Sequence, residues 1–212
     1  MSVEKTSLSS EERDIFDIEF PRLAKIYLPH RAVSEVFDEN YDYILETCEV
    51  MKKQFKGIPF QGMNARSGGF GWGIIRPQDV AKDHWTWRTN VTSINTSSHT
   101  DWIGTSSAYS KLDDEAGFCL LGFIDYSKNP IVADIQYRSA NTTYPIWHVQ
   151  PAMRFRESLN LFVLPKPLRQ LPESTFYVTC RYDGVGTHEL AFLGVLFAKG
   201  TYLLAQDSEA EV

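Results

Sequence analysis

Hydrophobic and polar residues alternate with a period of two along much of the chain after residue 70. In IVADIQYR (131–138) and TFYVTCRY (175–182) every second residue is apolar or aromatic, and most of the residues between are polar. Successive side chains of a strand point to opposite faces, so this pattern predicts two strands that each have one solvated face.

Two other segments, GFCLLGFI (117–124) and LAFLGVLFA (190–198), are apolar at almost every position. A strand of this composition needs cover on both faces, which a second sheet, a helix or another subunit can supply. Turn residues separate the segments, and no helical pattern of ten or more residues interrupts them, which favours antiparallel pairing over βαβ winding. Five further strands complete the expected series, at 71–75, 85–94, 146–149, 159–164 and 201–204.

Before residue 70 the apolar residues recur at helical spacing. Ser9 and Glu12 form a capping-box pattern, so we expect a short helix from about 10 to 20 that stops at Pro21. A stronger amphipathic helix is expected at about 39–56, where three lysines follow the apolar stripe and Gly57 ends it. A helix of two turns is not stable alone in water, so the first segment must dock on its own domain or on a neighbour.

The segment SGGFGWGIIRP (67–77) is rich in glycine but matches no phosphate-binding motif. A dinucleotide fingerprint needs glycines that open a helix, and a Walker loop needs Gly-Lys-Ser/Thr; neither is present. Glycines that alternate with Phe70 and Trp72 instead predict a strand that bends sharply or lets another backbone come close.

Candidate reaction chemistry is sparse. Five histidines, His30, His84, His99, His148 and His188, are scattered without the spacing of a metal site, although His99 and Asp101 could pair with His84, His148 or His188. There is no G-x-S-x-G motif, and Cys119 lies in an apolar strand. The acidic run 112–117 lacks the alternate spacing of a calcium loop. We therefore predict no catalytic, cofactor-binding or metal-binding residues, and no enzyme activity.

The positions of the cysteines and the distribution of charge exclude further classes of protein. Cys48, Cys119 and Cys180 are far apart and lie in apolar runs, so we expect buried free thiols in a reducing compartment. Of the net charge of −6, residues 1–20 carry −4 and residues 206–212 carry −3, which leaves +1 for the body of the chain. A chain without clustered Lys and Arg is not expected to bind nucleic acid directly. No signal peptide or membrane-spanning segment is predicted.

Two sets of aromatic and aliphatic residues are candidate contact sites. Trp85 and Trp87 lie two residues apart and would share one face of a strand, which suits a core layer, a subunit interface or a platform for a flat ligand such as a sugar ring. Ile15, Phe16 and Phe20 lie on one side of the first helix and are the expected subunit interface.

These observations predict a mainly β fold, an antiparallel eight-stranded jelly-roll sandwich with an N-terminal helical segment and one amphipathic helix at about 39–56. The expected organisation is a docking segment (1–22), one β-sandwich domain (23–205) and an acidic tail (206–212). Residues 70–205 resemble the single jelly-roll coat proteins of icosahedral viruses, through strand number, through LNLFVLP, TFYVTCRY and LAFLGVLFAKG as successive late strands, and through the preceding docking segment.

The resemblance implies a structural capsid protein that self-assembles into a shell, is made in the host cytoplasm and resides in the virion. Its partners would be copies of itself, other shell proteins and an underlying lipid membrane that it does not span, because the acidic N-terminus differs from the basic arm of coat proteins that package single-stranded RNA. The alternative is a β-sandwich module that binds a carbohydrate-type ligand. A third hypothesis is a cupin-like enzyme, and such an enzyme would be expected to have paired histidines.

Overall fold

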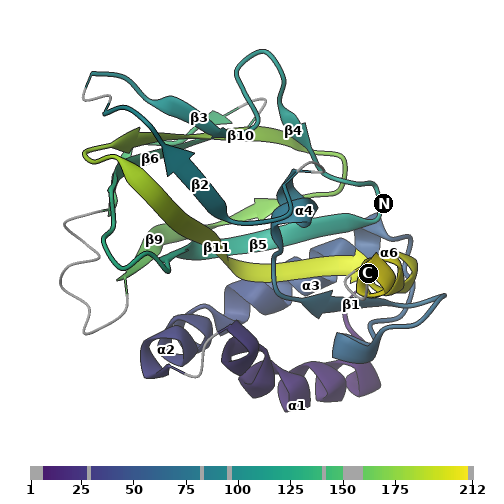
Figure 1. Cartoon of the computed structure of the whole chain (residues 1–212). Helices are drawn as coiled ribbons and strands as arrows, with labels where there is room; N and C mark the ends of the chain where they lie inside the picture. Colours follow the sequence, from purple (N-terminus) through teal and green to yellow (C-terminus); the bar gives the residue numbers. More distant parts are fainter. Residues whose placement is uncertain are drawn as a thin grey trace.

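The computed structural model describes residues 7–27, 30–81, 84–94, 97–139, 142–149 and 160–209. The chain begins with three helices, continues through strands that form two antiparallel sheets, and ends in a further helix (Figure 1). The prediction of a mainly β chain with N-terminal helices is confirmed. No helix of the described residues is long and apolar enough to cross a membrane.

The first sheet has five strands and contains both segments that are apolar throughout. Its order is β1 (Phe70–Gly73), β11 (Gly186–Lys199), β5 (Ala116–Asp125) and β9 (Asn160–Gln170), and β2 (Arg88–Val91) pairs with the first residues of β11. The pairing of β11 with β5 runs from Leu190 opposite Asp125 to Ala198 opposite Ala116. The two most apolar strands of the chain therefore lie side by side in the middle of this sheet.

The second sheet has six strands and is built around the two alternating segments. β10 (Thr175–Tyr182) pairs with β6 (Val132–Ser139) on one side, and with β3 (Thr100–Ile103) and β4 (Ser110–Lys111) on the other. β7 (Thr142–Thr143) and β8 (Trp147–His148) both pair with β6. Sequence analysis did not predict β3 and β4.

Two hydrophobic cores explain why β5 and β11 are apolar on both faces. Phe118, Phe123 and Phe192 point into the space between the two sheets and pack there against residues of β6 and β10. Cys119, Leu121 and Val195 point the other way and are buried under the N-terminal helices. Of the three covers that the sequence left open, the chain supplies a second sheet and a helical layer, so these strand faces need no second subunit.

The helical layer consists of α1 (Ser10–Tyr27), α2 (Arg31–Glu39) and α3 (Tyr41–Gln54), which lie across the outer face of the first sheet (Figure 1). The capping box is confirmed, since Ser9 Oγ accepts from the Glu12 amide at 3.2 Å and Glu12 accepts from the Ser9 amide at 2.6 Å. The predicted stop at Pro21 is wrong, because α1 continues for six more residues. Burial of Leu23 and Ala24 beyond the proline offsets the lost hydrogen bond.

The amphipathic helix predicted at 39–56 is confirmed as α3, whereas α2 was not predicted. α2 has only nine residues and buries Val33, Val36 and Phe37. A helix of this length is stabilised by packing against its neighbours more than by its own propensity, although its buried residues do recur at helical spacing.

Two strand assignments need correction. Residues 201–204 belong to helix α6 (Gly200–Glu209) and not to a strand, and α6 extends into the predicted acidic tail. The strand predicted at 159–164 is too short, because β9 continues to Gln170 through Pro165 and Pro167. Within the part of the chain that the structure describes, β9 pairs only with β5, and an edge strand tolerates prolines because it leaves one set of backbone groups unpaired.

The glycine-rich segment forms β1 and brings two backbones together, as predicted. A Cβ atom on Gly71 would collide with the carbonyl oxygen of Gly62, whereas one on Gly73 would meet nothing. Phe70 and Trp72 alternate with these glycines and are buried in the core under the helices. This segment is a structural contact rather than a phosphate cradle, because the short α4 (Pro77–Val80) follows only after Arg76.

The three cysteines are free and buried, as the sequence predicts. Burial raises the pKa of all three thiols, in the case of Cys119 to about 12. None of them is therefore a thiolate nucleophile at neutral pH.

Candidate functional site

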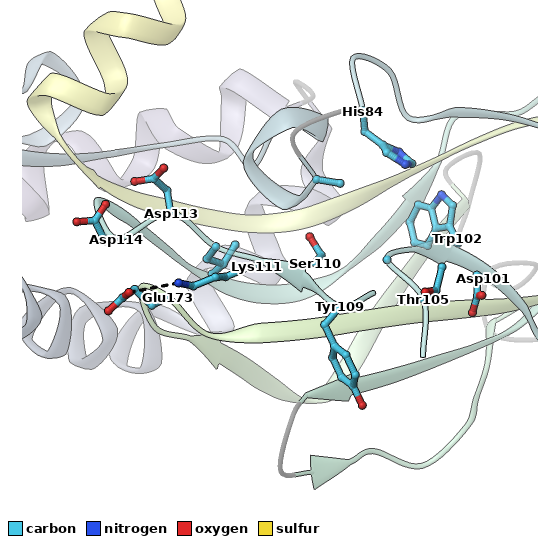
Figure 2. A pocket seen from close by; sticks show the side chains of 13 residues that line it. His84, Asp101, Trp102, Thr105, Tyr109, Ser110, Lys111, Asp113, Asp114 and Glu173 are labelled. Carbon is cyan, nitrogen blue, oxygen red and sulfur yellow. Dashed lines mark hydrogen bonds and ion pairs between the residues drawn. The ribbon is translucent and has the colours of Figure 1, made fainter. Parts of the chain in front are cut away.

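A groove of about 740 Å³ lies beside the edge strands of the second sheet (Figure 2). One wall comes from the residues that follow α4, and the other from β3, β4 and the loop between them. The residues that line it are Ala81, His84, Asp101, Trp102, Gly104, Thr105, Tyr109, Ser110, Lys111, Leu112, Asp113, Asp114 and Glu173.

The two ends of the groove differ in chemistry. Asp113, Asp114 and Glu173 lie at one end, and His84 and Trp102 lie at the other (Figure 2). The lining holds four carboxylates and one lysine, a formal charge of −3. Lys111 Nζ lies 3.3 Å from Glu173 Oε1, but both side chains are more than half exposed, so solvent screens this pair. Trp102 and Leu112 are buried and give the groove an apolar wall.

The outer face of the second sheet continues from this groove and carries a second set of polar side chains. Three consecutive outward positions of β6 face three of β10 in register, and the pairs are Asp134 with Arg181, Gln136 with Thr179, and Arg138 with Tyr177. We call these six residues the polar patch. Among the residues that the structure describes, no helix covers this face, in contrast to the outer face of the first sheet (Figure 1).

Asp134 is the most strongly bound member of the polar patch. Its carboxylate is buried and accepts hydrogen bonds from the Arg181 guanidinium and from His148 Nδ1 on the neighbouring strand β8. The His148 side chain is 72% exposed, so its other ring nitrogen faces solvent. Asp134 thus fixes the orientation of an arginine and of an exposed imidazole at once.

The other half of the polar patch is organised by Arg138. Its guanidinium donates to Gln136 Oε1 at 2.6 Å and to the Tyr177 hydroxyl at 2.7 Å, and it lies 5.5 Å from the centre of the Tyr177 ring. Tyr109, from the groove, packs edge-on against the same ring, with centroids 4.9 Å apart. Tyr109 therefore joins the groove to the polar patch.

Two buried polar atoms at this face have no hydrogen-bond partner, Thr179 Oγ1 and His99 Nε2. Burial lowers the pKa of His99; Asp134 partly opposes this, and Arg181 and Arg138 add to it. His99 is therefore neutral at pH 7, and its unpartnered nitrogen lies in the electrostatic field of the polar patch.

The histidines singled out from the sequence do not converge. His99 and His148 both interact with Asp134 from the outer face of the second sheet, whereas His84 lines the groove and His188 is buried between the sheets. His30 caps α2 through its ring. Within the described ranges, no three His, Cys, Asp or Glu side chains are placed to hold a metal ion.

The two tryptophans proposed as a ligand platform have different surroundings. Trp87 stacks on Phe192 at 5.4 Å and packs against Trp102, so its ring belongs to the core between the sheets. Trp85 is 69% exposed. A platform for a flat ligand remains a prediction, and Trp85 is the ring that is open to solvent.

The residues proposed as a subunit interface are packed inside one chain. Phe16 and Phe20 are buried against Trp72 and Tyr41, and Ile15 packs at the margin of the same core. A subunit contact through these side chains would require α1 to leave its own sheet. The exposed apolar residues of α1 are instead Ile18 and Ile26.

Sequence analysis missed the polar patch because alternation alone says that polar residues face solvent, not which strands lie beside each other. The signal was present: each of the two alternating segments has three outward positions, 134, 136 and 138 in one and 177, 179 and 181 in the other. Only the pairing of β6 with β10 brings these positions into three rows.

Scans against protein-family models, curated proteins and solved structures gave no match to this chain. Function is therefore argued from the fold and from the site.

Proposed function

We propose that this protein is a structural subunit that self-assembles into a shell, of the kind formed by single jelly-roll coat proteins of icosahedral viruses. The partners in this proposal are copies of the chain and other shell proteins, with an underlying lipid layer and without direct contact to nucleic acid. The virion is the corresponding location, after synthesis in the host cytoplasm.

The observation that carries the proposal is the order in which the strands pair. Three short strand pairs each share one partner: β1 and β2 share β11, β3 and β4 share β10, and β7 and β8 share β6. Counting each such pair as one interrupted strand reduces the eleven labelled strands to eight. This number agrees with the eight strands of a jelly roll.

The eight strands pair like a long ribbon folded in half. The first pairs with the eighth (β1/β2 with β11), the second with the seventh (β3/β4 with β10), the third with the sixth (β5 with β9) and the fourth with the fifth (β6 with β7/β8). Rolling this ribbon adds β11 beside β5 and β10 beside β6. These pairings support a jelly roll, a fold that hosts coat proteins as well as lectins and cupins, so the functional step is an analogy.

The surface that we propose for self-association lies at one end of the sandwich. Ile94, Tyr126 and Val185 follow β2, β5 and β10, and they are 51%, 42% and 58% exposed. Val91 opposite Gly186 and Asp125 opposite Leu190 place these three loops at the same end. Exposed apolar side chains on neighbouring loops are typical of association surfaces. The apolar faces of β5 and β11 are covered within one chain and are not part of this surface.

Electron microscopy of the concentrated protein tests the proposal, with sedimentation velocity as the measure of size. We expect closed particles of uniform size from the wild type and dispersed subunits from the triple variant Ile94→Ser, Tyr126→Ser, Val185→Ser. Ile18→Ser with Ile26→Ser on α1 is the matched control and should still assemble. A wild-type protein that sediments as a 24.2 kDa monomer at every concentration contradicts the proposal.

A second candidate function, a ligand-binding β-sandwich module, is favoured by the groove. Its volume of about 740 Å³ falls within the roughly 300–1,000 Å³ of typical small-molecule sites. Because Trp102 forms part of the wall, a ligand that enters should change tryptophan fluorescence in a saturable way. Tryptophan fluorescence that does not change with any member of a panel of sugars and amines contradicts this candidate function.

A further inference from the structure

We infer that the polar patch on the outer face of the second sheet binds a neutral carbohydrate. The inference rests on the second candidate function and names its ligand class. It does not depend on self-assembly, because one subunit carries the whole patch.

The polar patch is fixed in place before any ligand arrives. Arg138 is held by Gln136 and by Tyr177, and Arg181 is held by Asp134. Both arginines lie in the middle of a sheet whose neighbouring strands are hydrogen-bonded along their length. Side chains that are already immobilised lose little conformational entropy on binding, so their remaining donors are available at low cost.

Two buried polar groups at the polar patch have no hydrogen-bond partner among the described residues. Thr179 lies in the middle row of the patch, is 6% exposed, and points to the outer face because Val178 and Cys180 on either side of it point into the core. Its hydroxyl has no partner, and neither has His99 Nε2 near the same face. Buried polar atoms in proteins are nearly always paired, so Thr179 Oγ1 and His99 Nε2 can each take a partner from outside the chain.

The formal charge of the polar patch selects among polar ligands. Arg138 and Arg181 face two carboxylates, Asp134 within the patch and Asp101 at its border opposite Thr179, so the formal charges cancel. A balanced site has no net attraction for a phosphate or a polyamine. A ligand whose groups both donate and accept hydrogen bonds fits it, and sugar hydroxyls do both.

An aromatic ring, that of Tyr109, borders the polar patch. Tyr109 is 42% exposed, and its ring is fixed edge-on against Tyr177, at the point where the polar patch meets the groove. An exposed aromatic face beside hydrogen-bonding groups is suited to the apolar C–H face of a sugar ring. The continuity with the groove gives room for a chain of sugars rather than for one.

Saturation-transfer difference NMR tests the inference and works equally for a subunit and for an assembled shell. The probes are cellohexaose, xylohexaose, mannohexaose and chitohexaose, with hexagalacturonate as the anionic comparison. We expect saturation transfer to at least one neutral hexaose. Arg138→Met should weaken its binding by about tenfold or more, because the ligand hydroxyls lose a fixed donor.

Thr179→Val is the second variant. It keeps the shape of the side chain, leaves the hydrogen bonds of Arg138 intact and removes the unpartnered hydroxyl, so it should weaken binding while leaving the protein folded. Arg88→Met is the control: Arg88 is an exposed arginine of β2, paired with Glu189 in the first sheet, and its loss should change binding by less than about twofold.

The inference is overturned if no neutral hexaose receives saturation from the wild type, or if both patch variants bind like the wild type. Binding of hexagalacturonate alone also overturns it, while leaving a ligand-binding function in place. If electron micrographs show closed particles but the NMR experiment shows no binding of any sugar, the shell proposal is supported and the carbohydrate inference is contradicted.

Discussion

Single residues in this protein decide how closely segments approach and which protonation states are tolerated. Gly71 is the clearest steric case, because the backbone of Gly62 lies where its Cβ would be. His188 is the clearest electrostatic case, because it is fully buried and neither of its ring nitrogens has a partner. Each gives a prediction that a substitution can check.

Gly71→Ala should lower the free energy of unfolding by about 1–3 kcal/mol, because the added methyl group forces β1 away from the Gly62 segment. Gly73→Ala is the control, since a Cβ at that position meets no atom within 4 Å, and it should change stability by less than about 0.5 kcal/mol. Urea unfolding of the two variants measures the difference. Equal effects would mean that close approach is not the role of Gly71.

His188→Phe should remove an acid-dependent loss of stability. Burial lowers the pKa of His188 to about 4, against 6.5 for the ordinary imidazole, so protonation favours the unfolded chain. The stability is complete above pH 6.5 and is lost as the pH falls towards 4, by about 2 kcal/mol between pH 7.5 and 4.5.

Urea unfolding at these two pH values measures the effect. Asp125, whose pKa is raised by burial, acts in the opposite direction but is common to both proteins, so the difference between them isolates His188. A variant that loses as much stability on acidification as the wild type contradicts the prediction. His84→Gln, in the open groove, serves as the control.

At the scale of elements, tertiary packing overrides a local signal in α1. Pro21 has no amide hydrogen to donate to the Asp17 carbonyl, and its ring is exposed. The helix continues because Phe16 and Phe20 before the proline and Leu23 and Ala24 after it share one buried face. The same face packs on the first sheet, so the strands hold the helix straight enough to continue.

Pro21→Ala should therefore raise the free energy of unfolding by about 1–2 kcal/mol, since it restores a hydrogen bond in a segment that is already helical. Denaturant unfolding measures the gain, and amide exchange at residue 21 shows whether the new N–H is protected. A loss of stability would indicate that the chain turns at the proline, as the sequence alone suggests.

Strands were predicted well where periodicity was long, and poorly where an element was short. The alternating segments became β6 and β10, and the apolar segments became β5 and β11; the bounds agree for β10 and differ by at most four residues at each end of the others. β3 and β4 have too few residues to show a period, whereas the buried residues of α2 recur at helical spacing and were not recognised as a helix. Residues 201–204 have the composition of a strand, but they follow Gly200, whose Cα lies against the backbone of Arg66, and form a helix there.

At the scale of the whole molecule, the first sheet lies between two hydrophobic cores, with the second sheet on one side and the helices on the other. Cys180 belongs to the core between the sheets, and Cys48 and Cys119 belong to the core under the helices. The reactivity of the three thiols therefore measures the exposure of both cores in one experiment.

Native protein should react with less than one equivalent of Ellman's reagent, and denatured protein with three. Partial denaturation that exposes two thiols before the third would show that the helical layer separates from the sandwich before the sandwich unfolds. Rapid reaction of all three thiols in the native state contradicts the two-core arrangement.

By itself, the sequence determined the four longest-patterned strands and the helix α3, which of their faces are apolar, that the cysteines are buried and that the glycine-rich segment is not a phosphate site. These properties depend on residues that are close together in the chain, where periodicity and local chemistry act. Only the tertiary structure decided what covers β5 and β11, which strands pair, and that Asp134, Arg138, Thr179 and Arg181 share one surface. Contacts between distant segments depend on the register of β6 and β10, and a period of two is the same for every register and every partner.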